Sequence, residues 1–230
     1  MKAIICNNYG ALENLIYEES EAPKINDPDD VIIKVESCGV NFPDGLLVQG
    51  KYQHKPETPF VPGMEVSGKI LSLGSNVKEF VIGDKVAGLT QLGGYAEITK
   101  VNKQSVYKMP NSMNYDEACA LLCAYGTSHY ALKQRAKIKN GETLVVLGAS
   151  GSTGIAAIQI GKIYGAKVIA ASSSKEKQDF TEKLGADISI GYENLKDDLK
   201  KITNGKGVDI IFDPVGGSLF ETSSRALARY

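Results

Sequence analysis

The spacing of hydrophobic residues divides the chain into two parts. Before about residue 116, short runs rich in β-branched residues alternate with turns that contain Gly, Pro or Asn. Closely spaced runs of this kind are typical of a small antiparallel β-domain. The expected strands are Lys2–Asn7, Asp30–Ser37, Gly63–Leu73, Asp84–Gly88 and Gly94–Thr99.

After residue 116 the pattern becomes an alternation of helices and strands. Two helical segments come first, Asp116–Ala124 and His129–Arg135. The expected strands are Thr143–Leu147, Lys167–Ala171, Ile188–Ile190 and Val208–Phe212, with helices after Gly154, at Lys175–Leu184 and at Leu195–Thr203. This alternation predicts a doubly wound parallel sheet, and hence an α/β fold with domains at 1–124 and 125–230. Because dinucleotide-binding sheets of this type usually have six strands, we expect the sequence to be the front portion of a longer protein.

A glycine-rich turn, Gly148-Ala-Ser-Gly-Ser-Thr-Gly154, follows the first of these strands. Gly151 lets the backbone approach a phosphate, and Gly154 lets the following helix pack closely on the strand. Ala149 stands where the usual fingerprint has its first glycine. Backbone N–H groups and the positive helix end at such a turn bind a pyrophosphate. We therefore predict a dinucleotide site formed by Ala149, Ser150, Gly151, Ser152, Thr153 and Gly154.

The end of the next strand distinguishes NAD from NADP. A NAD site carries a carboxylate about 20 residues past the turn, which binds the ribose 2′-hydroxyl. Here Ala171 is followed by Ser-Ser-Ser-Lys-Glu-Lys177, with no acidic residue at the strand end. Hydroxyl and ammonium groups instead bind a 2′-phosphate through charge-assisted hydrogen bonds. The predicted cofactor is NADPH.

Composition excludes several classes of partner. A net charge of −1 does not favour nucleic-acid binding or an anionic membrane surface. No apolar run is long enough for a membrane span, and the first residues lack the build of a signal peptide. Four scattered cysteines do not form a disulfide framework, so we expect a reducing cytoplasm.

Short motifs occur in one order along the whole chain. They are Asn41-Phe-Pro-Asp44, Gly50-Lys-Tyr52, Pro59-Phe-Val-Pro-Gly-Met-Glu65, Gly83-Asp-Lys-Val86, Gly94-Tyr-Ala96, Tyr125-Gly-Thr127, Ala149-Ser-Gly-Ser-Thr-Gly154, Leu184-Gly-Ala-Asp187 and Asp213-Pro-Val-Gly-Gly217. Together they resemble the medium-chain dehydrogenase/reductases, specifically the zinc-free quinone oxidoreductase (ζ-crystallin-like) branch. The resemblance implies a GroES-like β-domain on the substrate side, followed by a Rossmann domain that binds the cofactor. It also implies a C-terminal return to the first domain, absent here, and a homodimer in the full-length form.

The resemblance implies roles for individual residues. Ser173 or Ser174, Lys177 and Tyr192 would surround the 2′-phosphate. Thr127, Val215 and Gly216 would line the nicotinamide ribose. Asn41, Asp44 and Tyr52 would lie beside the nicotinamide and the acceptor. There Asn41 can hydrogen-bond a carbonyl or a cofactor hydroxyl, and Tyr52 can donate a hydrogen bond or a proton.

Each of these residues also has a structural alternative. Asn41 and Asp44 can form an Asx-type turn, and Tyr52 can be a half-buried aromatic residue. Lys177 can be a solvated helix lysine and Tyr192 a packing residue, while the glycines near Val215 can be plain turn residues.

The positions that match catalytic zinc ligands carry Asn41 instead of Cys and Met64 instead of His. Cys123 matches the third ligand but has lost both companions, and a lone Cys on an apolar helix is most often a core residue. Residues 87–98 contain no Cys for a structural zinc, and His54 and His129 are isolated. We expect no metal.

Without a Lewis acid, alcohol oxidation is difficult because nothing stabilises an alkoxide. Hydride addition to a quinone or an α,β-unsaturated carbonyl mainly requires positioning and exclusion of water. The leading hypothesis is therefore an NADPH-dependent quinone or enone reductase. An enoyl-thioester reductase, for which Lys51 and Lys55 offer a weak sign, and a non-catalytic NADPH-binding protein stay open. An alcohol dehydrogenase is the weakest option.

Overall fold

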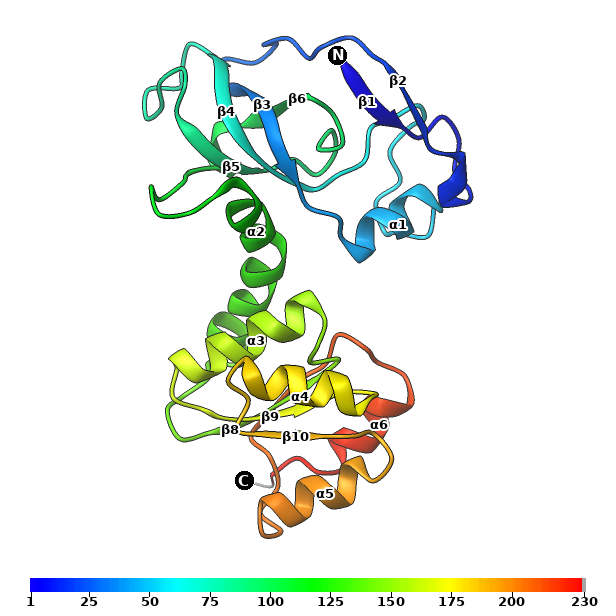
Figure 1. Ribbon diagram of the computed structural model, residues 1–230, viewed down its shortest axis with the longest axis vertical. Coiled ribbons are helices and arrows are strands. Elements are labelled where there is room, and N and C mark those ends of the chain that lie inside the picture. Colours follow the sequence, from blue (N-terminus) through cyan, green and yellow to red (C-terminus); the bar gives the residue numbers. More distant parts are fainter. Residues whose placement is uncertain (229–230) are drawn as a thin grey trace. The chain divides into compact units, whose positions relative to one another are not determined.

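The computed structural model describes residues 1–228 and divides into two compact units. Unit 1 is Met1–Cys123, and unit 2 begins at Ala124 (Figure 1). Unit 1 holds a curled antiparallel sheet and unit 2 a parallel sheet covered by helices. The predicted fold class, a GroES-like β-domain followed by a Rossmann-type sheet, is confirmed.

Unit 1 is built on a five-stranded antiparallel sheet with strand order β6-β3-β4-β5-β7. These strands are β3 (Asp30–Cys38), β4 (Glu65–Leu73), β5 (Lys85–Leu89), β6 (Ile98–Asn102) and β7 (Val106–Lys108). A separate two-stranded sheet pairs β1 (Lys2–Ile5) with β2 (Ile16–Glu19). Single 3₁₀ turns lie at η1 (Leu12–Asn14) and η2 (Lys103–Ser105), and one helix, α1, covers Phe42–Val48.

The core of unit 1 lies on one face of the sheet. Val31 and Ile33, two residues apart on β3, point to the same face and are fully buried. They pack with Ile70 of β4, Val86 of β5 and Val101 of β6. Ile32 between them is also buried, so β3, β4 and β5, which the sequence pattern indicated correctly, each contain a run of consecutive buried residues.

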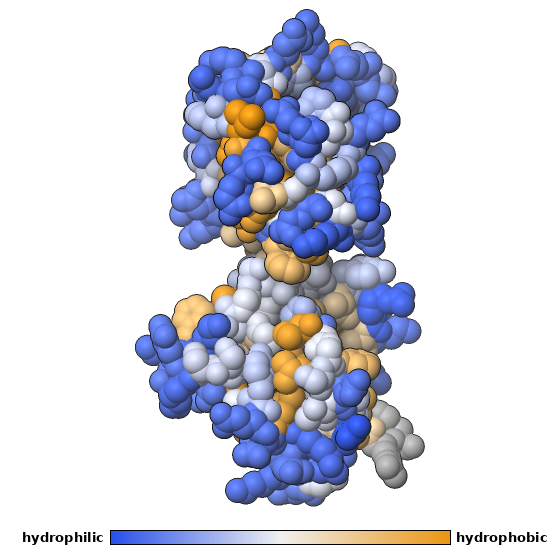
Figure 2. Space-filling model, turned by 90° about the vertical axis from the view of Figure 1, so that its right-hand side faces the viewer, coloured by the Kyte–Doolittle hydropathy of each residue, from blue (hydrophilic) through white to orange (hydrophobic). Residues whose placement is uncertain are grey.

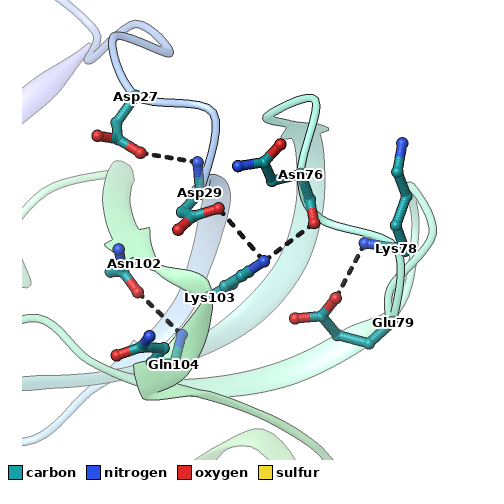
Figure 3. Close-up of polar contacts among 8 residues, drawn as sticks. All are labelled: Asp27, Asp29, Asn76, Lys78, Glu79, Asn102, Lys103 and Gln104. Atoms are coloured by element: carbon teal, nitrogen blue, oxygen red, sulfur yellow. Dashed lines mark hydrogen bonds and ion pairs between the residues drawn. The ribbon is translucent and has the colours of Figure 1, made fainter.

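Loops at one end of this sheet are joined by Lys103 (Figure 3). Its Nζ forms an ion pair with Asp29 Oδ1 at 3.2 Å and donates a hydrogen bond to the carbonyl oxygen of Asn76 at 3.0 Å. The Asn102 side chain accepts a hydrogen bond from the Gln104 backbone N–H and so caps η2. These contacts stabilise the turns that precede β3 and follow β4 and β6.

Unit 2 contains a four-stranded parallel sheet with strand order β10-β9-β8-β11. Its strands are β8 (Thr143–Leu147), β9 (Lys167–Ala171), β10 (Ile188–Ile190) and β11 (Ile210–Phe212). Its helices are α3 (Ser152–Ile163), α4 (Lys175–Lys183), α5 (Leu195–Ile202) and α6 (Ser218–Ser224). α3 and α4 lie on one face of the sheet, and α5 and α6 on the other (Figure 1).

Both faces of this sheet are buried. Leu144 and Val146 of β8 belong to the core beneath α3, whereas Val145 and Leu147 belong to the core with α5. A strand covered on both sides reads as a continuous apolar run, which is the pattern Leu144–Leu147 shows. The predicted bounds of β8, β9 and β10 are confirmed.

The helical stretch before β8 differs from the prediction. Two separate helices were expected, but α2 (Tyr115–His129) runs without a break into η3 (Tyr130–Arg135), which has π-helical hydrogen bonding. The boundary between the two units falls inside α2.

The surface is largely hydrophilic with separate apolar patches, as the face in Figure 2 shows for both units. The most exposed large apolar side chains of the described residues are Val40, Phe42 and Ile163, each more than four-fifths exposed. Among residues 1–228, no helix is long and apolar enough to cross a membrane.

Candidate functional site

The glycine-rich turn lies where the strand order of unit 2 reverses. The chain moves outward from β8 to β9 and β10, then returns to place β11 on the other side of β8. In open parallel sheets, ligands bind at the carboxyl ends of the strands at this reversal. The turn from Gly148 to Gly154 leaves β8 at that end.

Close backbone contacts shape this turn. A Cβ on Gly154 would lie 2.5 Å from the Gly148 carbonyl oxygen and 2.7 Å from Ala149 Cα, so only glycine fits here. Gly151 donates its backbone N–H to Gly148 O at 2.9 Å, and Gly148 has a φ of 60°. These contacts hold the start of α3 directly against the end of β8.

The turn offers specific donors to a ligand. Ala149 is fully buried, and its N–H already donates to Ala171 O at 3.2 Å. The N–H groups of Ser152, Thr153 and Gly154 belong to the first turn of α3, where an α-helix leaves them without intrahelical partners. The donors to an anion are therefore the residues after Ala149.

The serines after β9 lead into α4, which shares a hollow with the turn. Ser173, Ser174 and Lys177 are exposed. Ser174 is the N-cap of α4, and its Oγ accepts the Lys177 backbone N–H at 3.3 Å. Ser150 and Lys177 line one hollow of about 520 Å³, together with Lys183 and the carboxylates of Glu176 and Asp179. The structure thus brings together the turn and the lysine that the sequence assigned to the same ligand.

Tyr192 connects the ends of the two central strands. Its hydroxyl accepts the Gly148 N–H at 3.1 Å and donates to Ala171 O at 3.2 Å. The Tyr192 hydroxyl therefore links the start of the glycine-rich turn to the end of β9. The sequence did not predict this contact.

The other residues predicted to bind the cofactor lie around the same turn or near it. A Cβ on Gly148 would lie 2.8 Å from Val215 Cγ2, so Val215 packs against the turn. Asp213 Oδ1 accepts the N–H groups of Val215 and Gly216, both at 2.8 Å. Thr127 is exposed on α2.

In unit 1, Asn41 and Asp44 form the start of α1, a helix that was not predicted. Asn41 is the N-cap, and its backbone N–H donates to Asp44 Oδ2 at 2.8 Å. Pro43 at the first turn favours this start. The Asx-type turn considered for Asn41 and Asp44 resembles this cap, because in both a side chain bonds to backbone a few residues away.

Asp44 is a buried carboxyl with a perturbed pKa. It is 3% exposed, and burial raises its pKa above the usual value, although hydrogen bonds to its carboxylate oppose the rise. One of these bonds comes from Tyr95, whose hydroxyl donates to Asp44 Oδ2 at 3.0 Å. Burial, with the Asp44 charge nearby, also raises the pKa of Tyr95.

The Asn41 side chain is bonded to a second buried carboxyl, that of Glu65. Asn41 Nδ2 donates to Glu65 Oε1 at 2.8 Å, and the Cys123 backbone N–H donates to Glu65 Oε2 at 2.7 Å. Asn41, Asp44 and Tyr95 also line a hollow of about 430 Å³ whose other walls include Leu12, Val40 and Phe42.

Tyr52 is separate from this network. It is half-buried and packs against the cluster of Cys6, Leu47, Val48 and Phe60. The structure therefore brings together Asn41 and Asp44, but it does not bring Tyr52 into hydrogen-bonding contact with them.

Known proteins share both units. The alcohol dehydrogenase GroES-like domain family matches residues 27–111, and the zinc-binding dehydrogenase family matches residues 152–230. A quinone oxidoreductase of Pseudomonas syringae is 32% identical with a TM-score of 0.93, and the alignment covers 99% of this chain and 70% of that one. The chain belongs to the quinone oxidoreductases of the medium-chain dehydrogenase/reductase superfamily.

Two other members of this quinone oxidoreductase family add detail. The Escherichia coli quinone oxidoreductase, solved in complex with NADPH, is 29% identical with a TM-score of 0.94, and the alignment covers all of this chain and 71% of that one. A Nematostella vectensis quinone oxidoreductase-like protein 2 homolog is 38% identical over 99% of this chain. The chain spans 62% of that relative's length.

One matching family is named for zinc, but Asn41, Met64 and Cys123 do not form the three-ligand set that a catalytic zinc ion needs. Both Glu65 oxygens already accept hydrogen bonds. Burial raises the pKa of Cys119 and of Cys123 to about 12, and the Cys119 thiol donates a hydrogen bond to the Glu65 backbone oxygen at 3.5 Å. Within residues 1–228, no group of three or more His, Cys, Asp or Glu side chains is arranged to hold a metal.

Sequence reasoning missed Tyr95 and Glu65 as partners of the predicted site residues. Both stand in motifs that carry the family resemblance, Gly94-Tyr-Ala96 and the end of Pro59–Glu65. Their place in these motifs could have marked both residues as candidates. Their hydrogen-bond partners could not be predicted from the sequence, because those partners lie at least 24 residues away in the chain.

Proposed function

We propose that the protein is an NADPH-dependent reductase that transfers hydride to a quinone or an α,β-unsaturated carbonyl compound without a metal ion. Since the chain spans less than two thirds of the curated relatives' length, the proposal concerns the activity of the protein in its longer, family-like form.

The observation that carries the proposal is the arrangement at the ends of β8 and β9. The turn presents the N–H groups of Ser152, Thr153 and Gly154 at the strand-order reversal, where a pyrophosphate binds. Ser150 and Lys177 line the adjoining hollow. A lysine ammonium without an acidic residue at the end of β9 favours a 2′-phosphate over a free hydroxyl. The NADPH complex of the Escherichia coli family member supports this assignment.

The acceptor class follows from the donor set of unit 1. NADPH supplies a hydride when bound. Asn41, Met64 and Cys123 do not form a Lewis-acid site that would stabilise an alkoxide, so an acceptor that delocalises the added charge is favoured. Asn41 lines a hollow together with Asp44 and Tyr95, whose side chains are hydrogen-bonded to each other, and this supports a role for Asn41 in binding the ligand. Tyr52 stays a proposed proton donor on family resemblance alone.

The test is a fluorescence titration with NADPH and, in parallel, NADH, followed by turnover assays. We expect tight binding of NADPH, weaker binding of NADH and oxidation of NADPH by simple quinones and enones. A folded protein that binds neither nucleotide contradicts the cofactor assignment. Turnover of crotonyl-CoA in preference to quinones would support an enoyl-thioester reductase, and tight NADPH binding without any turnover would support a non-catalytic binder.

The family resemblance also leads us to propose that the longer, family-like form is a homodimer. Sedimentation equilibrium would measure its oligomeric state directly.

A further inference from the structure

Glu65 is a buried carboxylate with two hydrogen-bond donors and no ion pair among the described residues. It is 3% exposed. Asn41 Nδ2 reaches Oε1 and the Cys123 backbone N–H reaches Oε2. Burial of a charge without a cationic partner is costly, so the carboxylate must hold its donors in good geometry.

The backbone around Glu65 is shaped to admit the carboxylate. A Cβ on Gly39 would lie only 2.2 Å from Glu65 Oε1, so the chain just before Asn41 passes directly over that oxygen. The Gly39 N–H also donates to the Glu65 backbone oxygen at 3.1 Å. The start of β4, the approach to α1 and Cys123 on α2 are therefore joined at one side chain.

An asparagine amide has a donor end and an acceptor end, and its partners decide which way it points. A carboxylate only accepts, so it can bind Asn41 only through Nδ2. Oδ1 then points away from Glu65, where it serves the capping box of α1 toward the Asp44 backbone N–H and keeps a second lone pair for a further donor. Without Glu65, Nδ2 loses its acceptor, and only the capping box with Asp44 still orients the amide.

We propose that Glu65 is a positioning residue: it holds Asn41 with Nδ2 turned inward, so that Asn41 binds a hydroxyl or N–H donor of the ligand through Oδ1. This rests on the proposed function, because the ligand is that of the proposed reductase. It selects one of the two roles that the amide can have, and it excludes the role of donor to a ligand carbonyl.

The proposal can be tested by exchanging the carboxylate of Glu65 and the amide of Asn41, in two single variants and one double variant. In Glu65→Gln, the Cys123 N–H still needs the acceptor oxygen of the introduced glutamine, so the glutamine amide nitrogen faces Asn41 and turns the Asn41 amide over. In Asn41→Asp, two carboxylates meet at hydrogen-bond distance. In the double variant, the introduced glutamine donates its amide nitrogen to the introduced aspartate, the pair keeps one negative charge, and an acceptor oxygen again faces outward.

The measurements are thermal unfolding at about pH 5 and pH 8, and steady-state kinetics with NADPH and 1,4-benzoquinone. We expect Asn41→Asp to unfold at a lower temperature at pH 8 than at pH 5, relative to wild type, and the double variant to regain the loss. We expect Glu65→Gln to raise KM about tenfold, the size of one lost hydrogen bond, with a smaller change in kcat. The double variant should return KM to within about threefold of wild type. Glu57→Gln, an exposed charge removal in the same unit, should change neither quantity.

Two outcomes would overturn the proposal. Additive effects of the two substitutions on unfolding would show that Glu65 does not hold Asn41. A double variant that is stable but keeps the raised KM would show that Asn41 acts through its donor. If wild type neither binds NADPH nor reduces the quinone, the proposed function fails, while the unfolding cycle still decides whether Glu65 holds Asn41.

Discussion

Tyr95 donates a hydrogen bond to Asp44 Oδ2 at 3.0 Å, and the same oxygen accepts the Asn41 backbone N–H at 2.8 Å. A residue 51 positions further along the chain therefore holds the first turn of α1. The geometry of Asn41 depends on Tyr95 as well as on Glu65.

Replacement of Tyr95 by phenylalanine should destabilise unit 1. The change leaves Asp44 Oδ2 with one donor fewer in a buried site, which costs about 1–3 kcal/mol in the free energy of unfolding. Urea unfolding would measure the loss. Tyr107→Phe on β7, where the side chain is half exposed, is the control and should change stability little. Equal effects of the two substitutions would contradict a special role for the Tyr95 hydroxyl.

Asp44 should make stability depend on pH in the acid range. Its pKa in the fold is raised above the ordinary 3.8, so the folded state binds the proton more tightly than the unfolded state does. The resulting stability is fully present below the unfolded pKa and is lost as pH rises through the folded pKa. Asp44→Asn cannot ionise, so the difference in unfolding free energy between wild type and variant should decrease across this window and then level off. A difference that grows with pH would mean that the pKa is lowered instead.

Gly154→Ala should disrupt the turn, because the new Cβ would meet backbone atoms of Gly148 and Ala149 that cannot move aside. We expect a loss of about 1–3 kcal/mol in unfolding free energy and a clear weakening of NADPH binding. Gly126→Ala is a matched control inside α2, where no described heavy atom lies within 4 Å of the new Cβ. That substitution should stabilise the helix by about 0.5–1 kcal/mol. Equal tolerance of both would show that the close approach at Gly154 is unimportant.

Lys177→Ala should weaken NADPH binding about 10- to 100-fold, because it removes a charge-assisted hydrogen bond to the 2′-phosphate. Affinity for NADH, which lacks that phosphate, should stay the same. Parallel fluorescence titrations with the two nucleotides measure the difference. Lys175→Ala, which removes an exposed lysine paired with Asp179 on the same helix, controls for general loss of charge. An equal loss for both nucleotides would place Lys177 away from the 2′-phosphate.

Much of the fold could be predicted because runs of apolar residues mark its buried strands. β8 and β9 are continuous apolar runs in a sheet covered on both faces, and their bounds agree with the prediction to the residue. Failures occurred where burial gave no signal. All four residues of β2 are exposed, so no alternation marked this strand. The strand predicted at Gly94–Thr99 lies further along, at Ile98–Asn102, because Gly94 and Tyr95 pair with the loop at Pro62 and Gly63 instead of entering the sheet.

The candidate site was harder to predict than the fold. α1 contains Pro43 and Gly45, residues that indicate a turn in sequence, yet its capping and the burial of Asp44 and Leu47 make it a helix. The glycine-rich turn could be recognised because the atoms that require a glycine at position 154 belong to Gly148 and Ala149, a few residues earlier in the chain. The bond between Asn41 and Glu65 joins residues 24 positions apart, and no local rule predicts such a pairing.

The register of the parallel sheet also bears on synthesis of the chain. Leu144 of β8 pairs with Ile210 of β11, whereas the last strand of the sheet in unit 1 ends at Lys108. Domains generally fold as they leave the ribosome, the N-terminal one first. All strands of the unit 1 sheet have therefore been synthesised before β8 emerges, but one edge of β8 must wait until β11 has been translated. During that interval the edge of β8 that pairs with β11 stays unpaired, and four of the five residues of this strand are apolar.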